Sequence, residues 1–189
     1  TDKNSQNNDF TRCCCYVLGK DIFFISSKTQ SEIIQAAAKD GPNIEDPELL
    51  IQNTTRITGI KHWMTSLGIL TGNNNPTIDP TIMVRSTISD GFSKDEFVTF
   101  EKFLKKLNTK FPIMDGGQFR LETESKLQSP TTNLLRNNKV SVSLSFALRR
   151  LVSERVIEFE DRNDGKKFAL LKRDLQTDQI ISHLKYTGR

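Results

Sequence analysis

The amino-acid sequence predicts a mainly helical α+β chain with small β-hairpins. The stretch TTRITGIKHWMTSLGIL, Thr54–Leu70, has the pattern of an amphipathic helix that runs into a strand. The stretch SVSLSFALRRLVSERVIEF, Ser141–Phe159, repeats this arrangement. Turn-forming residues follow both stretches, as GNNNP after the first and NDG after the second. We therefore expect two similar units in tandem, each a group of helices closed by a hairpin.

Length and composition fit either one domain of moderate size or two small ones. The chain has 189 residues, of which 35% are hydrophobic and 26% charged. It contains no apolar run that could span a bilayer and no signal-peptide pattern, so we expect no membrane partner and a cytoplasmic location, or a nuclear one in a eukaryote. The net charge of +4 permits nucleic-acid binding without demanding it.

The three cysteines are consecutive, at Cys13–Cys15. Successive helical residues point about 100° apart, so these thiols do not converge on one metal, and adjacent cysteines form only strained disulfides. We expect them to act as small apolar side chains on a buried helix. The histidines, His62 and His183, lie far apart in the sequence. We therefore predict no metal site and no cofactor.

The first predicted unit covers residues 10–88, after a flexible tail at residues 1–9. In the helix at residues 54–67 one apolar stripe, widened by Trp63, is formed by Ile57, Ile60, Met64 and Leu67. Gly68 ends this helix. A short strand follows, then a hairpin tip at residues 73–81 and a second strand at residues 82–88.

The second predicted unit covers residues 93–173, after a break at SDGFS. A strongly amphipathic helix opens it, and a helix, a tight turn and a second helix at residues 141–155 follow. Leu144, Leu148 and Leu151 form the apolar stripe of that second helix. The segment VIEFEDRNDGKKFALLK predicts a hairpin with Asp164–Gly165 at its turn. Residues 174–189 are predicted as a C-terminal helix and tail, with the helix at residues 177–186.

These two units resemble the tandem winged-helix (winged helix-turn-helix) superfamily over nearly the whole chain. The resemblance implies one recognition helix at residues 54–67 and another at residues 141–155, each followed by a wing hairpin. The stretch TTRITGIKHWMTSLGIL is also similar to winged-helix accessory proteins of bacterial DNA-modification and defence clusters, because a Leu-Gly turn joins its polar-faced helix to the wing.

The resemblance predicts a double-stranded DNA-binding protein of transcription regulation or of DNA modification and defence. A recognition helix reads base edges in the major groove, and arginine can donate two hydrogen bonds to guanine. From the helices we expect contacts by Arg56, Thr58, Lys61, His62, Thr65, Ser145, Arg149 and Arg150. From the wings we expect contacts by Arg85, Arg162, Lys166 and Lys167. Carboxylates near the second wing oppose phosphate binding there, namely Glu154, Glu158, Glu160, Asp161 and Asp164.

The alternative function is a rigid adaptor, in which the same helices and wings contact other proteins and not DNA. Acidic flanks and self-covered recognition helices would favour this reading. A protein partner or a homodimer is compatible with both readings. We do not expect an enzyme, because the sequence has no nucleophile with an adjacent base and no phosphate-binding loop; DGGQ at residues 115–118 lacks the Lys-Ser/Thr pair.

Overall fold

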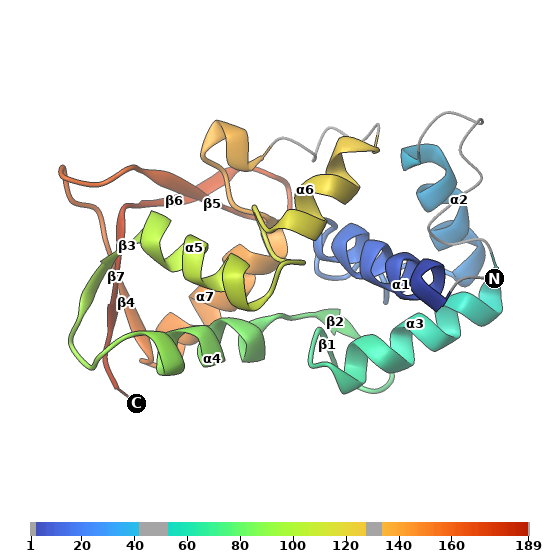
Figure 1. Ribbon diagram of the computed structural model, residues 1–189, viewed down its shortest axis with the longest axis horizontal. Coiled ribbons are helices and arrows are strands. Elements are labelled where there is room, and N and C mark those ends of the chain that lie inside the picture. The colour runs from blue at the N-terminus through green and yellow to red at the C-terminus, as the bar shows by residue number, and fades with distance from the viewer. Residues whose placement is uncertain (1–2, 42–52, 128–133, 189) are drawn as a thin grey trace.

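The computed structural model describes residues 3–41, 53–127 and 134–188, with side chains described from Asp9 onward (Figure 1). Within these ranges the chain forms seven α-helices and seven short strands, which confirms the mixed α+β class. The strands make small antiparallel sheets. In the part of the chain that the structure describes, no helix is long and apolar enough to cross a membrane.

The first unit consists of three helices and a small hairpin. In chain order the elements are α1 (Lys3–Leu18), α2 (Gln30–Asp40), α3 (Thr54–Ser66), β1 (Leu70–Thr71) and β2 (Thr77–Ile78). Helix α1 begins at Lys3, so most of the predicted flexible tail is helical. The backbone N–H of Ile78 donates to the carbonyl of Ile22 at 2.8 Å. The hairpin is thereby tied to the segment that follows α1.

The second strand of the hairpin is Thr77–Ile78, and the predicted strand at residues 82–88 lies instead within helix α4 (Thr81–Gly91). Asp79 favours the helix, because its carboxylate accepts from the backbone N–H of Thr81 at 3.0 Å. The residues that α4 buries include Met83, Val84, Thr87 and Ile88, which are spaced for one helical face. The sequence pattern predicted these residues as the returning strand of the hairpin.

We group α4 with the second unit because of its contacts, although most of its residues fall in the predicted first unit. Helix α4 packs against α5 (Phe100–Lys110) and α7 (Val142–Ser153), both of which belong to this unit. Helix α6 (Gln118–Ser125) lies between them in the sequence. The predicted helix before the tight turn falls largely outside the described residues, which resume at Leu134 with a short 3-10 helix, Leu135–Asn137.

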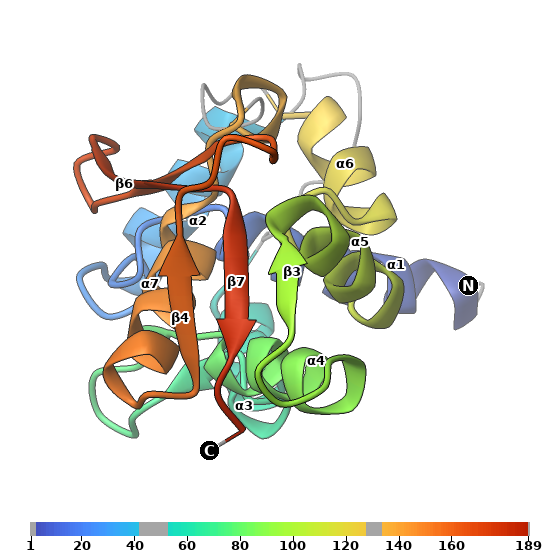
Figure 2. The same cartoon turned by 90° about the vertical axis from the view of Figure 1, so that its left-hand side faces the viewer.

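A three-stranded antiparallel sheet closes the second unit, in the order β3 (Phe97–Thr99), β7 (His183–Tyr186) and β4 (Ile157–Glu160) (Figure 2). In its register Leu184 lies opposite both Val98 and Phe159. A separate ribbon pairs β5 (Phe168–Leu171) with β6 (Thr177–Ile181).

This pairing corrects two predictions. Strands β4 and β5 do not pair with each other, so the expected hairpin around Asp164–Gly165 is absent from the described structure. The expected helix at residues 177–186 is strands β6 and β7. Partners distant in the sequence, β3 and β4, fix β7 as a strand.

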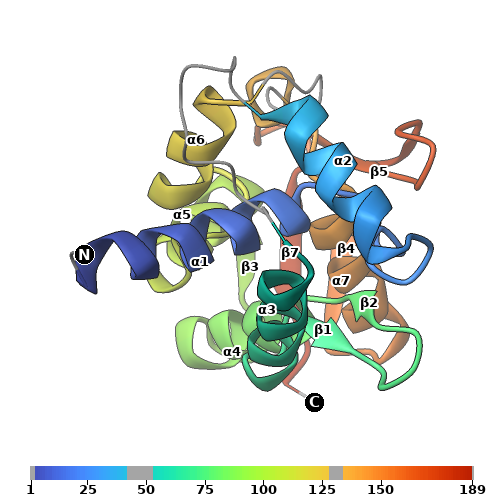
Figure 3. The same ribbon diagram turned by 90° about the vertical axis from the view of Figure 1, so that its right-hand side faces the viewer.

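One continuous hydrophobic core joins the two units, with buried side chains contributed from α1 through to β7. At the end of α1 the second unit supplies hydrogen-bond donors. Arg120 Nη1 donates to the carbonyl of Cys15 at 2.8 Å, and Ser143 Oγ donates to the carbonyl of Leu18 at 2.6 Å. Both satisfy carbonyls near a helix terminus. The units therefore form one body, with α3 and the hairpin at one side of it (Figure 3).

Candidate nucleic-acid interface

Helix α3 buries one face and leaves the other open. Ile57, Ile60 and Met64 are buried, as the sequence predicted. Of the predicted contact residues, Arg56, Thr58, His62 and Thr65 are exposed and Lys61 is half-buried. Trp63 was expected to widen the buried stripe, and this was wrong, because its side chain is 61% exposed. Leu67 was also placed in that stripe, and this was wrong too, because the residue caps the end of α3 and is 49% exposed. We call the surface formed by the unburied side chains the outer face of α3; it consists of Arg56, Thr58, Lys61, His62, Trp63, Thr65 and Leu67. It mixes hydrogen-bonding groups with apolar surface.

The polar groups on this face keep capacity for a ligand. Thr65 Oγ1 donates to the carbonyl of Lys61 at 2.9 Å, so its oxygen can still accept a hydrogen bond. Thr58 Oγ1 donates to the carbonyl of Thr54 at 3.2 Å and already accepts from Gln30 Nε2 at 3.3 Å. Within the described ranges, Lys61 makes no ion pair. Arg56 Nη1 lies 3.6 Å from Asp9 Oδ2, and both side chains are more than a third exposed. That distance exceeds a hydrogen bond, so the guanidinium remains available.

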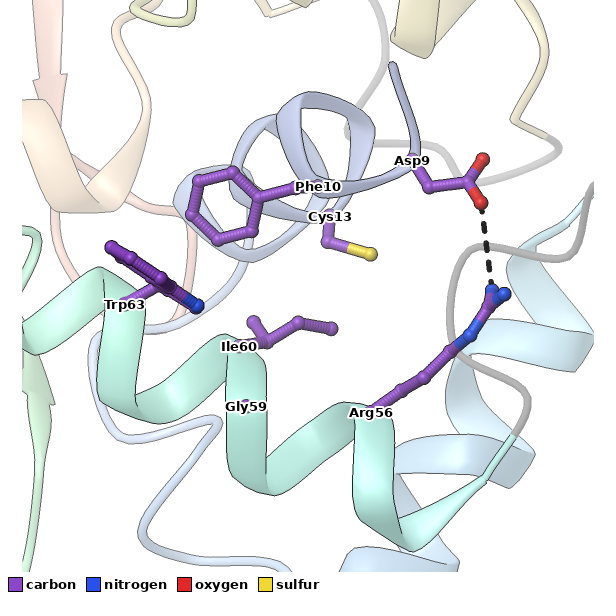
Figure 4. A pocket seen from close by; sticks show the side chains of 7 residues that line it. All are labelled: Asp9, Phe10, Cys13, Arg56, Gly59, Ile60 and Trp63. Atoms are coloured by element: carbon purple, nitrogen blue, oxygen red, sulfur yellow. Dashed lines mark ion pairs between the residues drawn. The ribbon is translucent and has the colours of Figure 1, made fainter. Parts of the chain in front are cut away.

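A pocket of about 250 Å³ lies between α1 and α3 (Figure 4). We call it the α1–α3 pocket; it is lined by Asp9, Phe10, Cys13, Arg56, Gly59, Ile60 and Trp63. Burial raises the pKa of Cys13 to about 12, so this thiol stays uncharged and the middle of the pocket is apolar. Sequence reasoning missed the α1 side of the pocket, because no local signal says which helix α1 packs against.

The second predicted recognition helix, α7, differs from α3 because other elements cover it. It packs against α4, β4 and β5. Ser145, predicted to contact DNA, is fully buried, and its Oγ accepts from the backbone N–H of Leu171 at 3.0 Å. Arg149 donates to Asp178 and to the carbonyl of Leu171, both at 3.1 Å. Strand β5 and the start of β6 therefore occupy the side of α7 that was expected to face DNA.

Arg85 and Arg150 belong to a charged cluster inside the second unit. Arg150 bonds to the carboxylate of Asp79, which is 1% exposed, and to Glu154 at 3.0 Å. Arg85 bonds to the same Glu154. Its place on α4 corrects the expectation that it stands at the base of the first wing. Both guanidiniums hold elements of the fold together.

The predicted second wing is a loop between β4 and β5. Its cations each have a carboxylate partner: Arg162 bonds to Glu160, Lys167 lies 3.0 Å from Asp161, and Lys166 lies 3.8 Å from Glu101. Arg162 also covers the ring of Phe97, at 4.0 Å from its centroid. Two of the acidic residues that oppose DNA binding in the sequence, Glu160 and Asp161, thus pair with cations of this loop that were predicted to contact DNA.

Residues 1–165 match the model of a family described as DpdG-like. No curated protein and no solved structure gives a match.

Proposed function

The chain belongs to the DpdG-like family, which links it to DNA-modification clusters, and from this premise we propose that it binds double-stranded DNA through the outer face of α3. The hairpin β1–β2 acts as the wing beside it. The observation that carries the proposal is the contrast between the two candidate recognition helices: α3 is open, and α7 is covered.

The order of the elements supports the winged-helix part of this proposal. In the second unit, α4, β3, α5, α7, β4 and β7 follow one another with sheet order β3-β7-β4, which suits a winged helix interrupted by α6 and by the β5–β6 ribbon. In the first unit, α1, α2, α3 and the hairpin follow the same plan. The bond between Ile78 and Ile22 stands where a third strand would pair.

The chemistry of α3 suits the major groove. An α-helix fits the groove, and base edges there present both donors and acceptors. Arg56 and Lys61 supply cationic donors, while Thr58 and Thr65 supply hydroxyl oxygens. The described wing tip, residues 72–76, carries no charged residue. Asp79 is turned into the protein, so no carboxylate of the hairpin opposes the phosphates.

An anisotropy titration with random-sequence duplex DNA at two salt concentrations tests the proposal. We expect binding that weakens with salt, with a slope of about −0.9 for each phosphate contact in a log–log plot. Two phosphate contacts from Arg56 and Lys61 give a slope of about −2. Absence of binding at low salt would reject the proposal and leave the adaptor function as the leading one.

One observation favours the adaptor function. Three exposed apolar side chains, Trp63, Leu67 and Ile82, lie on α3 and the adjacent start of α4. Exposed apolar clusters of this kind mark protein-binding surfaces. If that function holds, Leu67→Ala lowers the affinity for a protein partner, measured by isothermal titration, and duplex DNA does not compete with that partner.

A further inference from the structure

We propose that the α1–α3 pocket takes up one unpaired nucleobase from DNA held on the outer face of α3, an inference that rests on the proposed function. The pocket opens beside the same residues that face DNA, since Arg56 and Trp63 belong to both. A base entering it therefore comes from the strand already in contact with α3.

The two ends of the pocket differ in chemistry. Figure 4 shows Phe10 and Trp63 at one end, Asp9 and Arg56 at the other, and Cys13 and Ile60 between them. The aromatic end suits a flat ring, because every base presents a π-face that stacks on aromatic side chains. The ring contact described for Trp63 is with His62, at 6.3 Å between centroids, and the described contacts include none between Phe10 and Trp63. A base in the pocket can therefore stack on either of these aromatic side chains.

The ionic end distinguishes a base from an apolar side chain. Asp9 offers an acceptor and Arg56 offers donors, and the 3.6 Å between them leaves both free to bond to a ligand. The edge of an unpaired base displays donors and acceptors together, so it can satisfy both groups. A leucine or phenylalanine side chain from a protein partner would leave both unsatisfied. Arg56 also offsets the charge of Asp9, which lowers its repulsion of phosphate.

The size of the pocket limits its occupant to one ring system. At about 250 Å³ it falls below the range of about 300–1,000 Å³ found for drug-sized ligands. The sugar and phosphate then stay outside, near Arg56. Because extruding a base is least costly when the base has no partner, the protein should prefer DNA that contains an unpaired base.

Trp63 makes this measurable, because it is the only tryptophan in the chain. The probes are two short labelled duplexes of one sequence, one fully paired and one with a single base opposite an abasic site. Anisotropy of the label reports binding, and Trp63 emission reports stacking. We expect about tenfold tighter binding of the abasic-opposed duplex, together with quenching of Trp63. Phe10→Leu, which removes the other aromatic ring of the pocket, should abolish the preference. Phe119→Leu, the same substitution at an exposed ring of α6 outside both the pocket and the α3 face, should keep it.

The other possible outcomes distinguish a failure of this inference from a failure of the proposed DNA-binding function. Equal affinity for the two duplexes with unchanged Trp63 emission rejects the base pocket and leaves duplex binding standing. Failure to bind either duplex rejects the proposed function and the base pocket with it. Trp63 emission that depends on protein concentration and not on DNA assigns the pocket region to contact between two copies of the chain, which also overturns the inference.

Discussion

Arg150 on α7 donates to the buried carboxylate of Asp79, the residue two positions before α4 begins. The same carboxylate accepts from the backbone N–H of Thr81. One acidic group thus orders the start of α4 and fixes α7 against the end of the first hairpin. The contact also ties the guanidinium of Arg150 to the fold.

Removing this guanidinium should affect folding and not DNA binding. In Arg150→Ala the Asp79 carboxylate keeps its bonds to Thr81 but loses its cation while 1% exposed. We expect the free energy of unfolding, measured by urea titration, to fall by about 1–3 kcal/mol. DNA affinity should be unchanged. Lys172→Ala, which breaks an exposed pair with Asp178, should cost less than about 1 kcal/mol. Weaker DNA binding by Arg150→Ala at unchanged stability would return α7 to the interface.

The buried contact of Arg120 with α1 predicts that the two units unfold together. Arg120 Nε bonds to Glu124 at 2.5 Å, and Nη1 bonds to the carbonyl of Cys15. Arg120→Leu leaves the half-buried Glu124 unpaired, so we expect a loss of about 3–5 kcal/mol in a single urea transition.

Adding Glu124→Gln to Arg120→Leu should recover part of this loss, because it removes the unpaired charge. Glu122→Gln, at an exposed position of the same helix, is the control and should change little. Two separate transitions in the wild-type protein would contradict the single body described here.

The cysteines predict a loss of stability at alkaline pH. Burial raises the pKa of Cys13 to about 12 and that of Cys15 to about 11, from an ordinary value of 9.0. A raised pKa in the folded state stabilises the protein below the unfolded pKa, and this stabilisation is lost as pH rises through the folded pKa. Between pH 9 and 11 we expect each of these thiols to cost about 1.4 kcal/mol per pH unit.

Urea titrations across this range measure the slope, and Cys15→Ala isolates one thiol, because other titrating groups are common to both proteins. The variant should lose stability less steeply than the wild type above pH 9. Identical slopes would show that the thiol of Cys15 is not buried.

Local patterns predicted the elements whose structure depends on neighbours in sequence. The 3–4 spacing of Ile57, Ile60 and Met64 identified the buried face of α3, and the run of cysteines identified a buried helix. The turn residues after Thr71 identified the turn of the first hairpin, but its second strand, Thr77–Ile78, lies before the predicted one. The polar candidates on α3 also lie on its open face, although their role in binding remains a prediction.

Contacts between distant residues decided what the sequence left open. The spacing of Ile180, Ile181 and Leu184 fits a helix, but pairing with β3, β4 and β5 makes these residues strands. Elements distant in the sequence also cover α7, so its sequence pattern did not indicate that it is buried. The sequence predicts that Ser145 is exposed, whereas in the structure the backbone N–H of Leu171 on β5 donates to its hydroxyl. Asp79 and Arg150 meet across 71 positions of the chain.

The central claim is that α3, and not the loop between β4 and β5, contacts DNA. Two variants that each remove two positive charges compare them: Arg56→Ala with Lys61→Ala, and Arg162→Ala with Lys167→Ala. By duplex-DNA anisotropy we expect the α3 variant to bind at least about tenfold more weakly and its salt slope to fall by about 2, with its thermal midpoint nearly unchanged. The loop variant, whose cations already pair with Glu160 and Asp161, should bind like the wild type. Unchanged affinity in the α3 variant, or an equal loss in both, would contradict the claim.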